Sequence, residues 1–185
     1  MKHYLISIQK NEHCYIQEWY NHHKKFGFDK IVVFNNSPIP YNITDPAYQE
    51  IDVSKMEAPQ PYCYQWFYEK VMKLGDTATI LDGDEFLFIP TNIDSFVSNY
   101  MKDCDCLRLS WQTIGDCGNV KYEDKPVLER FKDIPPIDCV FNRDLPKGAA
   151  FVRRTNPWPC SWPCPPFPGA PGLPCRAFCV RQASP

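Results

Sequence analysis

The stretch Thr79-Ile80-Leu81-Asp82-Gly83-Asp84-Glu85-Phe86-Leu87-Phe88 places three acidic residues between two apolar runs. The first run has the composition of a short buried strand, so Asp82 stands at the carboxyl end of that strand. A carboxylate beside a buried strand costs free energy unless a cation compensates it. Because Gly83 lets the backbone turn tightly, Asp82 and Asp84 could present oxygens to one divalent ion. This geometry would suit a site that holds the diphosphate of an activated donor.

The chemistry of the two aspartates favours a hard cation. Mg²⁺ and Mn²⁺ prefer oxygen ligands and usually bind through one or two carboxylates together with substrate phosphates. The ion would neutralise a leaving diphosphate as a Lewis acid. The alternative for Asp82 and Asp84 is a solvated turn or a helix N-cap, but their position directly after an apolar strand favours the metal site. Glu85 would then support the two aspartates or pair with a cation.

Strand and helix patterns alternate on both sides of this stretch. Strands are expected at residues 3–9, 31–34, 50–53, 78–81 and 106–111, and helices at 16–26, 62–74 and 93–101. Such alternation predicts an α/β fold with a Rossmann-like, mostly parallel sheet that has helices on both faces. Ligands of such sheets bind at the carboxyl ends of the strands. His23 falls on the apolar side of the first helix and is expected to be a hydrogen-bonded core residue.

Polar segments follow several of these strands and should gather at one edge of the sheet. They are Lys10-Asn11-Glu12, Asn35-Asn36-Ser37, Asp82-Gly83-Asp84 and residues 112–118. Asn11 and Glu12 either cap the following helix or hydrogen-bond a base or ribose, with Lys10 near phosphate. Trp111, Gly115 and Asp116 belong to a glycine-flanked loop where an acceptor could bind. Asp116 is the candidate general base that would deprotonate its hydroxyl.

Composition narrows the class of protein. The chain has 185 residues and a net charge of −2, which gives no basic field for nucleic acid. No apolar run approaches the length of about 18 residues that a membrane span requires. The first residues read as a strand and not as a signal peptide, so a cytoplasmic protein is expected.

Residues 158–185 differ from everything before them. They contain eight prolines, four cysteines, two arginines and no acidic residue. Cys160, Cys164, Cys175 and Cys179 could imitate a four-cysteine zinc site. The alternative, which the abrupt change of composition favours, is a disordered tail or one read in a non-native frame. The chain therefore divides into a domain at 1–157 and a Pro/Cys-rich tail at 158–185.

Several of these motifs together resemble GT-A glycosyltransferases of the family 2 and family 92 type. The resemblance covers roughly residues 3–155, in the correct order. It rests on Lys10-Asn11-Glu12, Tyr15-Ile16, Glu18-Trp19, His22, Gly27-Phe28-Asp29-Lys30, Gln60 with Tyr64, Leu81 to Phe86, Trp111 to Gly118 and Val127 to Phe131. The resemblance implies a GT-A-like fold, a nucleotide-sugar donor, bound Mn²⁺ or Mg²⁺, and transfer of the sugar to a hydroxyl of a glycan or lipid-linked acceptor.

Individual roles follow from the same resemblance. Asp82 and Asp84 would hold the metal and diphosphate, and Trp111, Gly115 and Asp116 would face the acceptor. The residues expected to contact the donor are Lys10, Asn11, Glu12, Asn35, Gln60 and Asp82. A lipid-linked acceptor would bring the protein to a membrane surface as a peripheral protein.

One element of the family pattern is absent from the sequence. Relatives commonly carry a later histidine near the metal, and this chain has none after His23. The domain is therefore expected to be incomplete at its C-terminal side. Two other functions remain open: an inactive remnant that binds nucleotide, and a phosphatase or phosphotransferase with Asp82 as nucleophile. The second is disfavoured because such folds place the nucleophile after their first strand.

Overall fold

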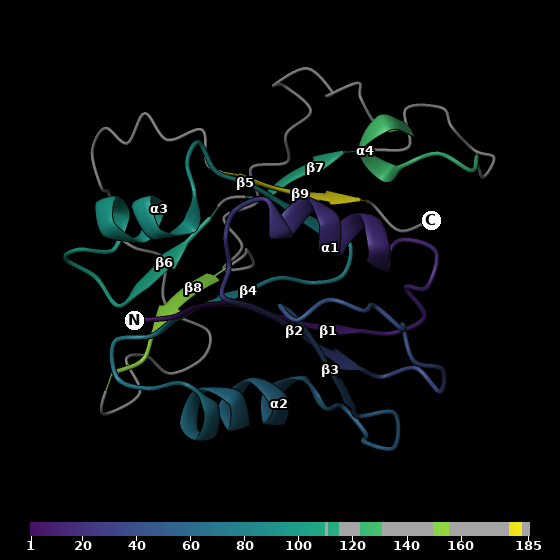
Figure 1. Ribbon diagram of the computed structural model, residues 1–185, viewed down its shortest axis with the longest axis horizontal. Coiled ribbons are helices and arrows are strands. Elements are labelled where there is room, and N and C mark those ends of the chain that lie inside the picture. Colours follow the sequence, from purple (N-terminus) through teal and green to yellow (C-terminus); the bar gives the residue numbers. More distant parts are fainter. Residues whose placement is uncertain (110, 115–122, 131–149, 156–177, 183–185) are drawn as a thin grey trace.

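A six-stranded sheet forms the centre of the computed structural model, which describes residues 1–109, 111–114, 123–130, 150–155 and 178–182. Its strands lie in the order β3-β2-β1-β4-β8-β6 (Figure 1). They span β1 (His3–Gln9), β2 (Lys30–Asn35), β3 (Tyr48–Asp52), β4 (Thr77–Ile80), β6 (Cys106–Arg108) and β8 (Ala150–Arg153). The pairs β3/β2, β2/β1 and β1/β4 are parallel, whereas β8 is antiparallel to both β4 and β6. The expected α/β fold with a mostly parallel sheet is confirmed.

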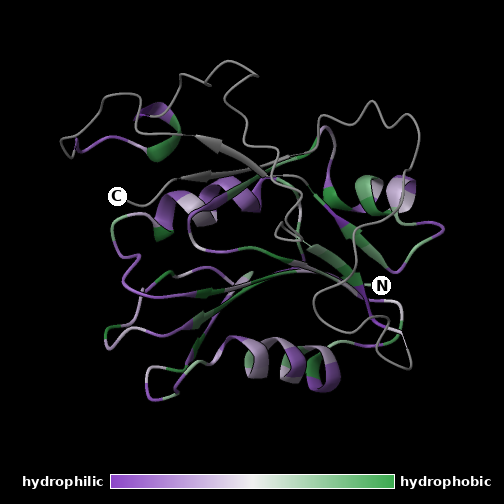
Figure 2. Ribbon diagram, turned by 180° about the vertical axis from the view of Figure 1, so that it is seen from behind, coloured by the Kyte–Doolittle hydropathy of each residue, from purple (hydrophilic) through white to green (hydrophobic). Residues whose placement is uncertain are grey.

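Alternate residues of the parallel strands face two separate cores. Leu5 and Ile31 pack with α1 (Ile16–Lys24) and α3 (Ile93–Tyr100) on one face. The residues next to them in the chain, Tyr4 and Val32, pack with α2 (Gln60–Trp66) on the other face. Figure 1 shows the main sheet between these layers. The helices in Figure 2 carry both hydrophobic and hydrophilic residues, as expected for elements with one buried face.

The chain changes direction at β1, and this places the carboxyl ends of two strands side by side. From β1 it passes through α1 to β2 and then to β3, moving away along the sheet. It then returns through α2 to β4, which pairs with the opposite edge of β1. In open α/β sheets such a reversal is the usual place for a ligand. The segments after β1 and β4 therefore meet at the reversal point.

Gly27 and Asn92 lie at helix ends, where glycine and asparagine are common. Gly27, with a φ of 82°, follows α1, and its N–H donates to the carbonyl of Lys24 at 3.1 Å; Gly75, with a φ of 88°, lies in the turn before β4. Asn92 caps α3, because its side-chain oxygen accepts a hydrogen bond from the Ser95 N–H at 2.9 Å. Within the described residues, no helix combines the length and the apolar character that crossing a membrane would require.

The helix expected at residues 62–74 begins earlier and changes type. It starts as α2 at Gln60 and continues as a one-turn π-helix at Phe67–Val71. The N–H of Met72 bonds to the carbonyl of Phe67, five residues back, at 3.1 Å. Met72 itself has an extended ψ of 140°, so the helix stops there. A π-turn of this kind shifts the register of the buried face, and hydrophobic periodicity does not reveal it.

A second sheet of three strands lies beyond α1. Its order is β5-β9-β7, formed by β5 (Glu85–Phe88), β9 (Phe178–Gln182) and β7 (Trp111–Ile114). The prediction of a single strand at residues 106–111 is therefore wrong, because β6 belongs to the main sheet and β7 belongs to the three-stranded sheet. A short helix, α4, occupies Val127–Arg130.

The tail is described only in part. Of residues 158–185 the structure describes 178–182, which form β9 between β5 and β7. Cys160, Cys164 and Cys175 lie outside the described residues, so the zinc alternative stays open. The division of the chain at residue 157 likewise stays a prediction.

Replacing Ala58 with glycine is expected to raise the free energy of unfolding by about 0.5 kcal/mol, because relief of its φ of 45° gains about 1–2 kcal/mol and the added freedom of the unfolded chain costs about 0.5–1 kcal/mol. The control is Ala47→Gly, at a position where φ is not positive, which should lower stability by about 0.5–1 kcal/mol through added freedom of the unfolded chain. Urea unfolding of both variants measures the difference. Equal shifts of the same sign would contradict the strain.

Candidate functional site at the carboxyl ends of β1 and β4

Gly83 brings the two polar segments of the reversal point into contact. A Cβ atom added to Gly83 would lie 3.1 Å from Cδ of Gln9 and 3.1 Å from Cγ of Glu12. Gln9 is the last residue of β1, and Glu12 belongs to the segment that follows it. The expectation that Lys10-Asn11-Glu12 and Asp82-Gly83-Asp84 share one edge is therefore met. Only a residue without a side chain fits this approach undisturbed.

Two hydrogen bonds close the turn at residues 82–85. The N–H of Glu85 donates to the carbonyl of Asp82 at 3.1 Å. In return, the N–H of Asp82 donates to Oε2 of Glu85 at 2.9 Å. Glu85 is only 2% exposed, whereas Asp82 and Asp84 are half-buried. Glu85 thus holds the backbone of the turn from inside, as a support for the two aspartates.

Negative charge accumulates at this edge of the sheet. Burial raises the pKa of the Glu12 carboxyl, and the charge of Asp84 raises it further. Burial also raises the pKa of the Tyr64 hydroxyl, with a further contribution from Asp82. Gln60 acts on the same hydroxyl in the opposite sense, so its side chain lies close to Tyr64. A bound cation would relieve the repulsion between the carboxylates.

The donor set fits a magnesium-type ion that shares its coordination with phosphate. Among the described residues, no group of three or more His, Cys, Asp or Glu side chains is arranged to hold a metal by itself. Mg²⁺ does not need such a group, because it commonly binds one or two carboxylates and completes its shell with water and substrate phosphates. Asp82 and Asp84 supply carboxylates of this kind on a turn that Glu85 closes.

Two main-chain N–H groups of the segment after β1 are already used within the chain. The N–H of Asn11 donates to Oγ of Ser37 at 2.6 Å, and the N–H of Glu12 donates to the Tyr41 hydroxyl at 3.4 Å. These bonds hold Asn11 at a φ of 62°, which asparagine tolerates better than most residues. Lys10 and Asn11 are exposed, so this segment offers side chains to a ligand.

Asn35 and Gln60 stand in different surroundings. Asn35 is buried at the end of β2, where its amide donates to the carbonyl of Ile39 at 2.9 Å and to Oε1 of Glu50 at 2.7 Å. Its own oxygen accepts the N–H of Ser37 at 2.7 Å. Asn35 therefore shapes the loop that supports Asn11. Gln60 is exposed at the start of α2, and donor contacts for both residues stay predictions.

The acceptor-side residues are described only at one point. Trp111 begins β7, whereas Gly115 and Asp116 lie outside the described residues. The general-base role of Asp116 therefore stays a prediction.

Sequence reasoning missed Gln9. Its side chain is 3% exposed and packs under Gly83, and its amide donates to Oγ of Ser7 at 3.1 Å. Its carboxamide oxygen is a buried acceptor without a hydrogen-bond partner among the described residues. A polar residue at the end of an otherwise mostly apolar strand was the available signal. Gln9 thus brings an amide to the contact between the two segments.

Comparison with known proteins gives similarity in fold to solved structures only. No protein-family model and no curated protein matches the chain. Among solved structures, the chain is similar to "Crystal structure of S. aureus TarS 1-349", with 15% sequence identity and a TM-score of 0.43. The similarity covers 83% of this chain and 47% of that chain, so this chain spans less than half of the matched structure's length.

Proposed function

We propose that this chain is a glycosyltransferase domain that binds a nucleotide-diphosphate sugar together with Mn²⁺ or Mg²⁺ and transfers the sugar to a hydroxyl. The observation that carries the proposal is the contact of Gly83 with Gln9 and Glu12. It joins the acidic turn after β4 to the segment after β1, at the reversal point where α/β sheets bind ligands. The order of motifs that resembles GT-A glycosyltransferases supports the same function.

Asp82 and Asp84 would hold the metal, which as a Lewis acid would neutralise charge on the leaving diphosphate. Glu85 fixes the turn on which these carboxylates stand, through its bonds with Asp82. Glu12 adds a further carboxylate, whose pKa is raised by burial and further by the charge of Asp84. These carboxylates therefore create a negative potential that would attract a cation, and the cation could in turn bind a diphosphate.

The donor's nucleoside would lie along the segment after β1. Lys10 is exposed and cationic, which suits an approach to phosphate, and Asn11 and Glu12 carry the polar groups to bind base or ribose. Gln60, exposed at the start of α2, completes the proposed donor contacts, and Asn35 would act on the donor through the loop that supports Asn11. Trp111, Gly115 and Asp116 would face a glycan or lipid-linked acceptor, with Asp116 as the base for its hydroxyl.

Calorimetric titration of the chain with UDP and with GDP tests the proposal. Binding of one of the two is expected with Mn²⁺ or Mg²⁺ present and is expected to disappear with a chelator, because diphosphate and carboxylates repel each other without the ion. Transfer is tested separately with the matching nucleotide-sugar, whose turnover is measured by the amount of nucleotide released. Equal affinity with and without chelator would contradict the metal site.

Replacing Gly83 with alanine is expected to lower affinity for the metal–nucleotide complex by about tenfold, with a small cost in stability. The added methyl group would crowd Gln9 and Glu12 at 3.1 Å, so one of these side chains must shift. The contrast is Gly75→Ala, which meets no atom within 4 Å but has a φ of 88°. That variant should lose about 1 kcal/mol of stability through strain and retain its affinity. Calorimetry and urea unfolding separate the two effects; unchanged affinity in Gly83→Ala would contradict the contact.

A further inference from the structure

Side chains of α1 bind the main-chain groups on one edge of β5, in the place that a neighbouring strand would otherwise take. Nε1 of Trp19 donates to the carbonyl of Glu85 at 2.8 Å, and Nε2 of His22 donates to the carbonyl of Leu87 at 2.7 Å. The N–H of Leu87 donates to Nε2 of His23 at 3.0 Å. Glu85 and Leu87 are two residues apart, so their main-chain groups point to the same edge of the strand. Three side chains of one helix thus satisfy that edge.

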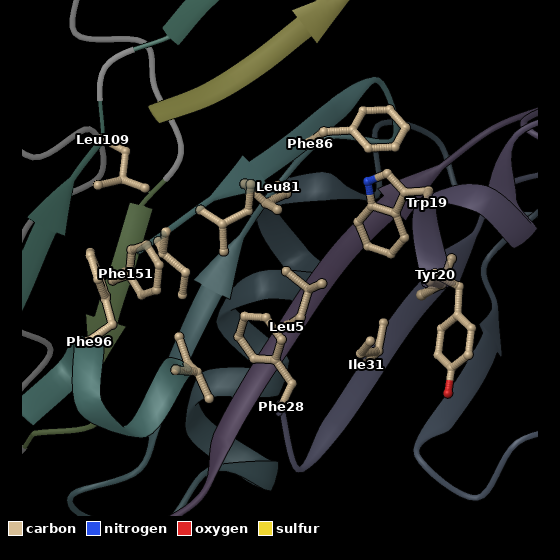
Figure 3. Packing of buried hydrophobic residues seen from close by; sticks show 14 of the residues in the cluster. Leu5, Trp19, Tyr20, Phe28, Ile31, Leu81, Phe86, Phe96, Leu109 and Phe151 are labelled. Atoms are coloured by element: carbon tan, nitrogen blue, oxygen red, sulfur yellow. The ribbon is translucent and has the colours of Figure 1, made fainter. Parts of the chain in front are cut away.

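The hydrogen bonds between α1 and β5 are buried, and their geometry shows which atom donates and which accepts in each. Trp19, His23 and Leu87 are fully buried, and Figure 3 shows the Trp19 ring reaching from its helix toward the strand that carries Phe86. Because Nε2 of His23 accepts from Leu87, its Nδ1 must carry the hydrogen, which it donates to the carbonyl of Trp19 at 2.7 Å. Each main-chain group therefore has one specific partner on α1.

The same contacts connect the two halves of the proposed donor site. α1 is anchored to Glu12, whose carbonyl accepts the N–H groups of Tyr15 and Ile16 at 2.9 Å each. β5 is anchored to Asp82 through the two hydrogen bonds that Glu85 makes with it. The hydrogen bonds between α1 and β5 consequently set where the turn at 82–85 lies relative to Glu12.

We propose that Trp19, His22 and His23 are positioning residues that fix the metal-holding turn at 82–85 against the segment after β1. This inference rests on the proposed function for the identity of the ligand. The mechanical part does not, because it concerns only how firmly α1 holds β5.

Trp19→Phe is the first test, since it keeps an aromatic ring and removes the N–H that binds Glu85. Hydrogen exchange of the amides of Asp82 and Glu85 is expected to become about tenfold faster, while amides of β1 and β2 keep their rates. Affinity for Mn²⁺ with UDP or GDP, whichever binds the parent protein, should fall about tenfold. The matched control is Tyr20→Phe on the same helix, which removes one polar group beside Tyr48 and should change neither quantity.

His22 provides the second test through rescue. His22→Leu removes the donor to the Leu87 carbonyl and is expected to speed amide exchange at residues 82–87, whereas His22→Gln keeps an N–H donor and should restore much of the protection. Unchanged exchange at residues 82–85 in both Trp19→Phe and His22→Leu would overturn the inference. A different outcome separates this inference from the proposed function. If Trp19→Phe and His22→Leu speed amide exchange but neither the parent protein nor any variant binds UDP or GDP, the mechanical coupling is supported and the proposed function is overturned.

Discussion

Asp84→Asn is expected to lower the affinity for the Mn²⁺–nucleotide complex by about a hundredfold, because a neutral amide replaces one of two anionic ligands of a hard cation. Asparagine has nearly the shape of aspartate, so the turn that Glu85 closes should persist. The same change removes a charge that raises the pKa of Glu12. The unliganded variant should therefore be as stable as the parent or slightly more stable.

This combination of weaker binding and undiminished stability is the signature of a metal ligand. Asp82→Asn should reproduce the loss of binding. Asp103→Asn is the matched control, since Asp103 is an exposed carboxylate on another loop, and it should leave the affinity unchanged. Calorimetry with Mn²⁺ and nucleotide measures affinity, and urea unfolding without ligand measures stability. Parent-like affinity in both Asp82→Asn and Asp84→Asn would show that the ion, if any, binds elsewhere.

Acidification from pH 6.5 to pH 5 is expected to lower the free energy of unfolding steeply. Burial lowers the pKa of both His22 and His23, and for His23 the lowering is large. Around His22, Lys25 adds to the lowering whereas the Leu87 carbonyl and Glu18 oppose it; around His23, His22 adds to it and the Trp19 carbonyl opposes it. In the unfolded chain both imidazoles titrate near their ordinary value of about 6.5.

The folded and unfolded states bind different numbers of protons, and this difference sets the direction in which stability changes with pH. Below about pH 6.5 the unfolded chain binds protons that the folded chain excludes, so stability is full above this pH and is lost as the pH falls. Two histidines give a limiting slope of about 2.7 kcal/mol per pH unit. Glu12 acts in the opposite direction, because its raised pKa favours the folded state as the pH falls toward the ordinary value of 4.5. The measured slope should therefore be somewhat smaller.

Urea unfolding at closely spaced pH values measures this slope. His22→Gln should make this slope shallower, by at most one proton, and His13→Gln at an exposed position is the control variant. A stability that stays constant between pH 6.5 and pH 5 would contradict the neutral, buried state of the two histidines.

Local sequence signals were enough to predict the parallel part of the fold. β1, β2 and β4 are short apolar runs followed by polar residues, and the helices between them have periodic apolar faces. Elements that are consecutive in the chain usually lie side by side in space, which leaves few possible orders for these strands in the sheet. The meeting of the segments after β1 and β4 could be predicted for the same reason. His23 was also correctly expected to be a hydrogen-bonded core residue.

What escaped prediction depends on partners far away in the chain. The alternating pattern at residues 106–111 looks like one strand, yet β6 pairs with β8 and β7 pairs with β9. Nothing within the segment marks where it changes sheets. In the site, the bonds of Ser37 and Tyr41 to the segment after β1 join residues 26 and 29 positions apart. Hydroxyl groups on a loop carry no pattern that reveals such partners.

The closure of the β5 edge by α1 also bears on how copies of this protein meet one another. A strand edge with unpaired N–H and carbonyl groups is a template for a strand of another molecule, and it promotes aggregation. At Glu85 and Leu87 those groups already have partners on Trp19, His22 and His23. Beside a turn that must keep its carboxylates accessible, this edge therefore offers no template for intermolecular β-pairing.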